Sequence, residues 1–262
     1  MTTSNQDPTI TQKKKADQYN DPKHNYLHYW DGRQYEHAAE ELAIKKLLRG
    51  RRFKHAVDIG GGYGRLCVLL ERYADKVTLA EPSQQQLDIA ADFLKTHPEI
   101  DRKLMQADDL QFEDGSVDLI TMIRVMHHLP DPTTEFNEIA RSLSAGGYAI
   151  IEVANYAHAR NRLKHLVRGK RLPLKPVDIR STINKGEDEI AFVNHNPKTV
   201  LRQLKSAGLD VDATLSVSNL RSTRLKKLLP PKLLLTAENV LQRPLASSYF
   251  GPSIFFLVRK SS

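Results

Sequence analysis

The chain has 262 residues, of which 40% are hydrophobic and 27% charged, and its formal net charge is +8 at pH 7. This length suits one α/β domain with appended segments, and the ordinary composition excludes a fibrous protein. The longest apolar runs, such as residues 254–258, are strand-sized and far short of the ~20 residues that cross a bilayer. The N-terminus lacks the apolar core of a secretory signal, so we expect none.

The single cysteine, Cys67, excludes an internal disulfide framework and a multi-cysteine metal site, and it indicates a cytoplasmic protein. We interpret it as a small, buried, apolar side chain. The excess of positive charge favours an anionic partner, which could be nucleic acid, an anionic membrane surface or an acidic small molecule. Charge alone does not choose among the three.

The first structural signature follows a polar N-terminal tail. Residues 1–23 show no apolar periodicity, so we expect them to be disordered. Aromatic residues are dense after the tail, at Tyr26, Tyr29, Trp30 and Tyr35. Apolar residues from 38 to 48 then recur at helical spacing until Gly50, which is a natural helix stop. The pattern predicts an N-terminal helix, and we expect residues 24–50 to form a helical lid.

Beyond this helix, short apolar runs alternate with amphipathic segments, which is typical of parallel strands joined by crossover helices. The predicted strands are 54–59, 76–81, 102–106, 117–123, 147–154, 209–217 and 253–259. Helix signals include a capping box at Ser83 and Gln86, cap residues Asp131 and Asn196 before prolines, and a stop at Gly208. The sequence therefore predicts an α/β fold with a Rossmann-like, doubly wound, seven-stranded, mostly parallel sheet and helices on both faces.

Two longer segments, 157–190 and 219–249, interrupt this alternation. Both are basic, through Arg160, Arg162, Lys164, Arg168, Lys170 and Arg171 in the first and Arg221, Arg224, Lys226 and Lys227 in the second. Long insertions at the ends of a rigid scaffold commonly carry specificity. We therefore expect residues 24–262 to form a single domain in which both insertions are caps over the site.

The most informative run is VDIGGGYGR at 57–65, in which an apolar strand enters a glycine-rich turn and then a helix. Glycines let the backbone bend sharply and approach a ligand, and a helix N-terminus offers N–H groups. The dinucleotide fingerprint has a glycine where this chain has Arg65, and a pyrophosphate would be repelled by an acid as close as Asp58. The turn thus favours a ligand with an ammonium group over a nicotinamide cofactor.

Two more candidate ligand groups follow the next strands. Glu81 ends the run LAEP about twenty residues beyond the glycines, where a carboxylate binds both ribose hydroxyls. The alternative is a strand-end acid that faces water. The run QADDLQFEDGSVDLI at 106–120 offers a polar side chain and backbone amides suited to the edge of adenine, and Gly115 turns the chain into the next strand.

Taken in order, these motifs resemble the class I S-adenosylmethionine-dependent methyltransferases, most closely the group that includes the ubiquinone and menaquinone biosynthesis methyltransferases (methyltransferase type 11). The matching pieces also include MHHLPDP at 126–132, LSAGGYAIIEV at 143–153 and NPKTVLRQLKSAGLDV at 196–211. The resemblance spans residues 36–217, and the run 252–260 would complete the family's sheet as an antiparallel last strand. It implies S-adenosylmethionine as methyl donor and S-adenosylhomocysteine as product.

The resemblance also implies a donor site. Asp58 and Gly60 would lie beside the methionine part of the donor, Glu81 would hold the ribose, and residues 106–108 would frame the adenine. Gln106 stands where the family often has an acid, so either the glutamine serves or Asp108 replaces it. The residues implied for the donor are Asp58, Gly60, Gly61, Gly62, Gly64, Glu81, Pro82, Gln106, Ala107, Asp108 and Arg124.

The acceptor site is expected beyond the carboxyl ends of the strands, at the loops after the fourth and fifth. Methyl transfer from a sulfonium is an in-line displacement that depends on positioning, and a hydroxyl or carbon acid also needs a base. Candidate bases are His127, His128 and Tyr156, and for the histidine pair a structural role is an equal alternative. Expected substrate or lid residues are Tyr29, Trp30, Arg33, Tyr35 and Asn155. Packing on the sheet is the alternative for the aromatics.

The sequence narrows the acceptor only by class. A small organic or lipid-like acceptor, methylated on oxygen or carbon, is the leading hypothesis. Segment 158–171 has the apolar side needed to lie on an anionic membrane, or is simply a solvated basic helix. An RNA or protein acceptor is the alternative, although the chain lacks the Asn/Asp-Pro-Pro-aromatic tetrapeptide of amino-directed base methyltransferases. A non-catalytic protein that binds S-adenosylmethionine is a third reading. We expect no metal, because His24 and His28 have no acid nearby.

Overall fold

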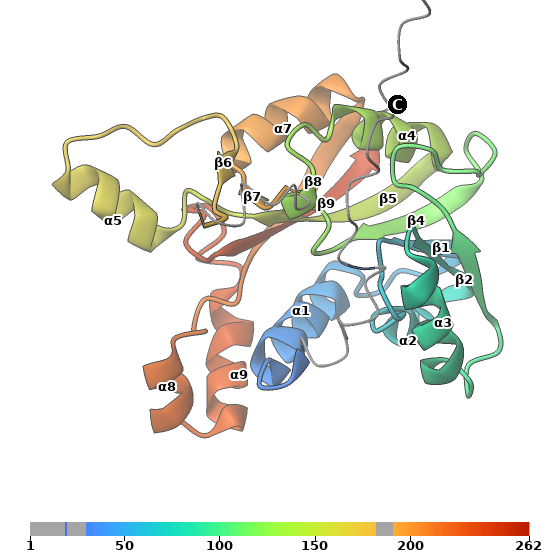
Figure 1. The fold of residues 1–262 in the computed structure, drawn as a ribbon, viewed down its shortest axis with the longest axis horizontal. Helices are drawn as coiled ribbons and strands as arrows, with labels where there is room; N and C mark the ends of the chain where they lie inside the picture. The colour runs from blue at the N-terminus through green and yellow to red at the C-terminus, as the bar shows by residue number, and fades with distance from the viewer. Residues whose placement is uncertain (1–18, 20–29, 182–190, 262) are drawn as a thin grey trace, which may run out of the picture.

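The computed structural model describes Tyr19, residues 30–181 and residues 191–261. Its central feature is a seven-stranded sheet of order β3-β2-β1-β4-β5-β9-β8, in which only β9 runs antiparallel to its neighbours. This architecture confirms the predicted fold class (Figure 1). The strands are β1 (Phe53–Ile59), β2 (Ala74–Glu81), β3 (Ile100–Leu104), β4 (Val117–Met122), β5 (Leu143–Ala154), β8 (Leu209–Val217) and β9 (Ser253–Lys260).

The third strand differs from its predicted position. It begins and ends two residues earlier than expected, because Ile100 is its buried residue while positions 101–104 are exposed at the edge of the sheet. Gln106, placed at the end of the predicted strand, instead forms an isolated bridge with Asp109. A small sheet pairs β6 (Val177–Asp178), in the first insertion, with β7 (Val193–Asn194), just after it, and was not predicted. A strand of two residues is too short to show the alternation of apolar and polar residues by which strands are predicted.

Helices cover both faces of the sheet. The face that carries Ala56, Leu79 and Phe255 packs against the segments α1 (Gln34–Leu47), α2 (Cys67–Leu70) and α3 (Gln84–Phe93). The opposite face, with Val57 and Phe256, packs against α4 (Thr133–Ser142) and α7 (Pro197–Ser206). The two helix layers lie below and above the sheet in Figure 1. Consecutive strand residues thus enter different cores, as the period of two requires.

The helix starts and stops agree in part with the sequence. Asn196 caps α7 by accepting a hydrogen bond from the backbone N–H of Lys198, and Gly208 follows the helix with a φ of +76°, as expected. The prediction that Asp131 directly caps the next helix is wrong. Helix α4 begins at Thr133, and Asp131 reaches the Thr133 N–H from one residue further out.

Only one of the two hydrogen bonds of the predicted capping box forms at the start of α3. Ser83 Oγ accepts the backbone N–H of Gln86 at 3.2 Å, but the Gln86 amide does not return to Ser83. The Ser83 N–H donates instead to the carboxylate of Glu81 at 3.0 Å. A carboxylate is a stronger acceptor than an amide oxygen, so Glu81 displaces the expected partner.

The two insertions lie outside the layered body. Helix α5 (Ala159–Val167) projects from it and buries no residue, while α8 (Thr223–Leu228) and α9 (Pro231–Leu241) lie beside α1 (Figure 1). The Tyr35 hydroxyl donates to Glu238 Oε2 at 2.7 Å, which ties α1 to α9. No helix in the described part of the chain combines the length and hydrophobicity needed to cross a bilayer.

Candidate functional site

The chain reverses its winding direction between β1 and β4, which is where doubly wound sheets bind ligands. The glycine-rich turn follows β1 at this point. The Gly60 N–H still donates to Ala80 O at 2.7 Å, which extends the strand pairing by one residue. Gly60 has a φ of +61°, and a Cβ there would lie 2.5 Å from Val125 Cγ2. Only glycine lets the turn pass this close to the segment after β4.

Glu81 fixes this turn to the end of β2. One carboxylate oxygen accepts the Gly62 N–H at 2.8 Å, and the other accepts the Ser83 N–H at 3.0 Å. The residue is only 5% exposed, so both bonds form away from bulk water. An ionised carboxyl has about four acceptor sites, and these two hydrogen bonds use two of them.

A cavity of about 240 Å³ opens beside Glu81. Six residues implied for the donor line it: Gly60, Glu81, Pro82, Gln106, Ala107 and Arg124. Tyr19, Ser83, Val125, His128 and Leu129 complete much of its wall. Of the two alternatives for the position near the adenine, Gln106 lines this cavity and Asp108 does not.

Asp58 lies deeper, in the wall of a small cavity of about 20 Å³. It is 1% exposed, and its carboxylate accepts the Thr121 hydroxyl at 2.6 Å. Cys67, buried as expected, lies beside it, with its sulfur 3.7 Å from Oδ2. Burial raises the pKa of Asp58 to about 6. A Cβ at Gly61 would collide with this carboxylate, so Gly61 makes room for Asp58, and Gly64 similarly makes room for Leu94.

Two arginines meet a buried acid above the glycine turn. Glu40 on α1 accepts Arg65 Nη2 and Arg124 Nε, each at 2.7 Å. The Trp30 ring stacks on both guanidinium groups, with its centroid 3.8 Å from Arg65 Cζ and 4.9 Å from Arg124 Cζ. The sequence drew attention to Trp30 and Arg124 but missed Glu40. The sequence does contain a signal for Glu40, since this residue is an acid that stands among the helically spaced apolar residues of positions 38–48.

Arg124 lies where three cavities meet. It lines the cavity beside Glu81, the small cavity beside Asp58 and a third one of about 360 Å³. Its φ is +63°, a region that non-glycine residues rarely occupy, and its N–H donates to Glu152 Oε2 at 3.1 Å. Such strain is concentrated at functional sites. The hydrogen bond to Glu152 holds the Arg124 backbone in this conformation, and the Arg124 side chain then lines all three cavities.

The third cavity lies at the carboxyl ends of β4 and β5. Its wall includes Arg33, His127, Glu152 and Asn155. Burial, followed by the neighbouring His128 and Arg124, lowers the pKa of His127 well below its ordinary value, which leaves a neutral imidazole. Burial raises the pKa of the Glu152 carboxyl, whose Oε1 accepts the Ser253 hydroxyl at 2.6 Å. Glu152 was not among the predicted site residues, because it lies within the β5 strand.

Several predicted site residues have other partners. The Tyr156 hydroxyl lies 3.3 Å from His165 Nε2 on α5, outside the residues that line the third cavity, so we withdraw it as a candidate base. Tyr35 is committed to Glu238 and to the Leu220 N–H, so it does not reach the donor site. Tyr29, like Tyr26, His24 and His28, lies outside the described residues.

His128 and Asn155 are also occupied. The His128 ring contacts Tyr19 Oη through Nε2 at 2.6 Å and the Ala191 carbonyl through Nδ1 at 3.0 Å. The Asn155 amide donates to the carbonyls of Tyr249 and Gly251 and accepts the N–H of Ala157. Both residues position backbone around the cavities, which leaves His127 as the candidate base. Most of the predicted tail lies outside the described residues, but its Tyr19 lines the cavity beside Glu81.

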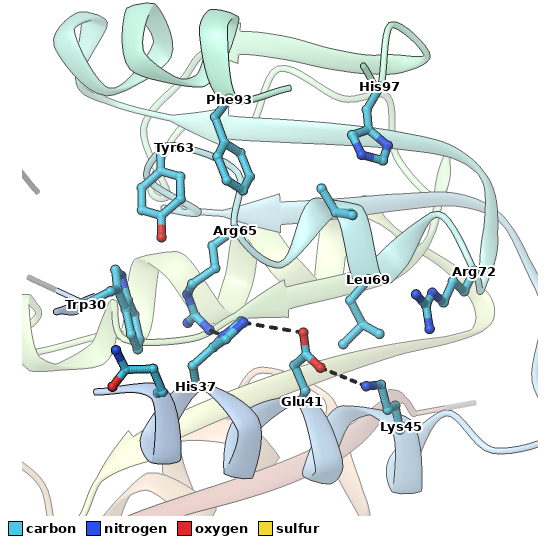
Figure 2. A pocket seen from close by; sticks show the side chains of 12 residues that line it. Trp30, His37, Glu41, Lys45, Tyr63, Arg65, Leu69, Arg72, Phe93 and His97 are labelled. Carbon is cyan, nitrogen blue, oxygen red and sulfur yellow. Dashed lines mark hydrogen bonds and ion pairs between the residues drawn. The ribbon is translucent and has the colours of Figure 1, made fainter. Parts of the chain in front are cut away.

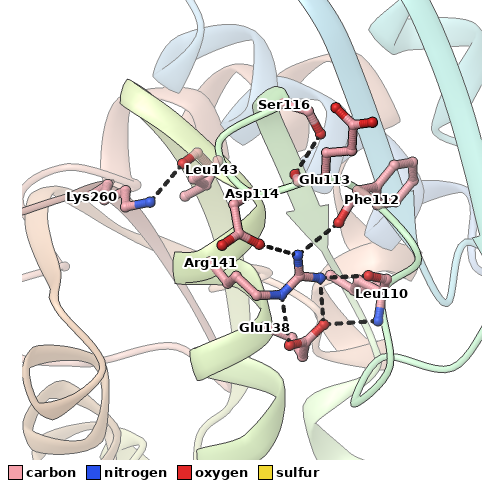
Figure 3. Close-up of polar contacts among 9 residues, drawn as sticks. All are labelled: Leu110, Phe112, Glu113, Asp114, Ser116, Glu138, Arg141, Leu143 and Lys260. Atoms are coloured by element: carbon pink, nitrogen blue, oxygen red, sulfur yellow. Dashed lines mark hydrogen bonds and ion pairs between the residues drawn. The ribbon is translucent and has the colours of Figure 1, made fainter.

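A network around Arg141 holds the loop that carries Gln106. The guanidinium group donates to the Leu110 carbonyl at 2.6 Å, the Phe112 carbonyl at 2.7 Å and the Asp114 carboxylate at 2.7 Å (Figure 3). Glu138 on α4 accepts two further N–H bonds from Arg141. Five donors in a rigid fork suit this task. No local pattern predicts this network, because Leu110, Phe112 and Asp114 are about thirty residues from Arg141 and meet it only when α4 packs on the sheet.

A further cavity of about 500 Å³ lies between α1 and the segment that carries α2. Figure 2 shows Trp30, Tyr63 and Phe93 along one side and the polar row of α1 along the other. In that row Glu41 binds Lys45 at 2.7 Å and lies 3.4 Å from His37. Arg65 projects into this space and contacts His37. Trp30, Tyr63 and Arg65 line both this cavity and the small cavity beside Asp58.

The fold is the Rossmann-like fold of the class I S-adenosylmethionine-dependent methyltransferases. Residues 57–151 match the family model described as a methyltransferase domain. The ubiquinone biosynthesis O-methyltransferase of Xanthomonas oryzae pv. oryzae is 29% identical over 101 residues, which cover 38% of this chain and 42% of that protein. The chain spans less than half the length of the curated relatives that it matches.

Solved structures agree on the fold. The methyltransferase in complex with the Trm112 activator of Haloferax volcanii superposes with a TM-score of 0.59 and 18% identity, covering 91% of this chain and 99% of that one. Geranyl diphosphate C-methyltransferase of Streptomyces coelicolor, solved with S-adenosyl-L-homocysteine, gives 0.53 and 18%, covering 92% and 85%. At these identities the likeness concerns the fold alone.

Proposed function

We propose that this protein transfers the methyl group of S-adenosylmethionine to a small organic or lipid-like acceptor, on oxygen or carbon. The observation that carries the proposal is the meeting of two cavities at Arg124, one with Glu81 in its wall and the other with His127 and Glu152. In-line displacement needs a donor chamber and an acceptor chamber that join at the methyl group.

The chain's residues suit the donor in three places. Glu81, already oriented by two backbone N–H groups, would accept the ribose hydroxyls. The amide of Gln106 lies where the adenine edge would be read. The buried acid Asp58 beside the turn would face the ammonium group, and the guanidinium groups of Arg65 and Arg124 flank the same small cavity, where a carboxylate would bind. The bound donor supplies an electrophilic methyl group.

The acceptor side offers one base and one positioning acid. His127, whose imidazole is neutral, would accept the proton of an acceptor hydroxyl or carbon acid as its nucleophile attacks the methyl carbon. Glu152 would hold the Arg124 backbone in its strained conformation through the 3.1 Å hydrogen bond. Transfer breaks the bond from sulfur to methyl carbon, whose electrons stay on sulfur, and forms the bond from acceptor to methyl.

The first insertion supports peripheral contact with an anionic membrane. Leu163, Leu166 and Val167 on α5 are 62%, 76% and 79% exposed, and arginine and lysine residues surround them. An amphipathic helix of this kind binds through apolar burial together with attraction to anionic lipids. Since α5 begins beside the third cavity, such contact would bring that cavity close to a lipid-like acceptor.

The deciding experiment incubates the purified protein with donor labelled in its methyl group and with separate fractions of small metabolites, lipids, RNA and protein. We expect label in the metabolite or lipid fraction and unlabelled RNA and protein. The His127→Asn protein is the matched control, because it keeps a polar side chain and loses the base. Label in RNA alone would overturn the acceptor class. Donor binding without label in any fraction would favour a non-catalytic binding protein.

A further inference from the structure

Tyr19 lines the cavity beside Glu81 and is held there by hydrogen bonds at both its backbone and its side chain. Its carbonyl oxygen accepts the Ser83 hydroxyl at 2.8 Å, and its own hydroxyl lies 2.6 Å from His128 Nε2. The phenol and imidazole rings also meet edge to face, with their centroids 5.3 Å apart. The tyrosine ring therefore has a defined position in the cavity wall.

The two partners of Tyr19 follow different strands of the sheet. Ser83 comes directly after the end of β2, and His128 belongs to the short helix η3 (Met126–His128) that follows β4. In the sheet β1 lies between β2 and β4, and the glycine-rich turn follows β1. A residue that contacts both partners thus connects the two sides of the cavity across the end of β1.

Ser83 links Tyr19 to the carboxylate that we propose for the ribose. The Ser83 N–H donates to Glu81 at 3.0 Å, and the Ser83 hydroxyl donates to the Tyr19 carbonyl. The same hydroxyl oxygen accepts the Gln86 N–H, which is compatible because a hydroxyl donates one hydrogen bond and accepts two. The position of Tyr19 is therefore set by the same residue that orients Glu81.

The contacts of His128 define how it holds the tyrosine. Its Nδ1 lies 3.0 Å from the carbonyl oxygen of Ala191, which can only accept, so Nδ1 carries the proton. In the neutral imidazole Nε2 is then an acceptor, and the Tyr19 hydroxyl is the donor. One backbone carbonyl thus fixes the tautomer that receives the tyrosine hydroxyl.

We propose that Tyr19 is a further donor-binding residue, whose ring packs against the nucleoside part of S-adenosylmethionine, and that His128 is the positioning residue that holds this ring. The inference rests on the proposed function in taking the cavity beside Glu81 as the donor site. Glu81 and Gln106, which we propose for the ribose and the adenine, line the same cavity as Tyr19. An aromatic ring suits this ligand, because a nucleobase offers a π-face on which such rings stack.

The test measures the affinity of S-adenosylhomocysteine by calorimetry and its dissociation rate by stopped flow, in the full chain. Tyr19→Ala removes the ring, so we expect binding at least tenfold weaker, with faster dissociation. Tyr19→Phe keeps the ring and loses only the bond to His128, so the loss should be about fivefold. The control is Tyr156→Phe, because that hydroxyl lies beside His165 and Tyr156 does not line this cavity. Wild-type affinity in Tyr19→Ala would overturn the proposal.

A double-mutant cycle with His128→Ala tests the positioning role. If His128 acts through Tyr19, then adding Tyr19→Phe to His128→Ala should change the affinity by less than about twofold, because the bond is already lost. Equal losses in the two backgrounds would contradict this role.

Urea unfolding of every variant separates binding from folding, and a loss of affinity that only followed a loss of folded protein would also overturn the proposal. A wild-type protein that fails to bind S-adenosylhomocysteine would refute the proposed function. Wild-type binding that neither Tyr19 variant alters would refute this inference alone.

Discussion

Glu40 of α1 and Arg124 after β4 form an ion pair with 2.7 Å between Oε1 and Nε, and this pair joins the N-terminal helix to the strand end where three cavities meet. Arg65 from the glycine turn binds the other oxygen of the same carboxylate. The side chain of Glu40 is 3% exposed. One acid therefore holds two arginines in position.

The variant Glu40→Gln should lower the free energy of unfolding by about 3 kcal/mol, because it leaves two guanidinium groups without their buried counter-charge. Urea unfolding followed by circular dichroism measures the loss. The control is Glu41→Gln on the next position of α1, where the pair with Lys45 is partly exposed. That change should cost less than about 1 kcal/mol. Equal losses in the two variants would show that the Glu40 cluster contributes nothing special.

The variant Glu81→Gln should weaken the binding of S-adenosylhomocysteine at least tenfold, about 1.4 kcal/mol. The amide has one acceptor oxygen, so it cannot both hold the Gly62 and Ser83 N–H groups and bind the ribose. Calorimetry gives the affinity. Glu99→Gln, which removes an exposed acid just before β3, should leave it unchanged. If the Glu81→Gln protein bound S-adenosylhomocysteine with wild-type affinity, the assignment of Glu81 to the donor site would be wrong.

Asp58 predicts a pH dependence of stability. Burial raises its pKa from 3.8 to about 6, so the folded protein holds this proton more tightly than the unfolded chain. As pH rises through that window the unfolded chain releases the proton first, and the free energy of unfolding falls by about 3 kcal/mol in total. In Asp58→Asn this contribution to the decline should be absent, while exposed Asp92→Asn keeps it. Unfolding curves at several pH values between 3.5 and 7 compare the three proteins; parallel curves would contradict the assignment.

The variant Arg141→Lys should lower the free energy of unfolding by about 2 kcal/mol, because an ammonium group cannot serve the Leu110 and Phe112 carbonyls and Glu138 together. Affinity for S-adenosylhomocysteine should fall as well, since this network holds the loop that carries Gln106. Urea unfolding and calorimetry measure the two effects. Arg102→Lys, at an exposed position of β3, is the control. If Arg141→Lys lowered only the stability and left the affinity unchanged, the loop that carries Gln106 would not contribute to donor binding.

The apolar side of α5 predicts lipid binding. Changing Leu163 and Leu166 to glutamine should reduce association with phosphatidylserine vesicles about tenfold, with little change in stability, because α5 buries no residue. Vesicle flotation measures the association, and vesicles of phosphatidylcholine alone should bind weakly. The control is Leu228→Gln on α8, an equally exposed leucine at 77%. Unchanged flotation of the α5 variant would exclude this helix as the contact.

Local sequence was sufficient for the sheet and the glycine turn. The strands β1, β4 and β8 were predicted to within a residue, because buried strands carry continuous or alternating apolar residues between turn signals. The start of the edge strand β3 was misplaced, since its exposed residues carry little pattern. Gly60 and Glu81, which the sequence predicts for the donor site, both line the cavity at the strand ends, because the ends of β1 and β2 place them there.

Side-chain direction and long-range pairing were decided only by the tertiary structure. Tyr156 lies two residues after the end of β5, where a cavity residue is expected, yet its hydroxyl lies beside His165 of the first insertion. Glu40 is 84 residues from Arg124, and Arg33 is far from Arg221, so no local pattern relates them. The sequence by itself determined the sheet, the turn and the methyl donor, which depend on neighbours along the chain. Only the tertiary structure determined which charged side chains come into contact, because these contacts depend on how α1 and the insertions pack against the sheet.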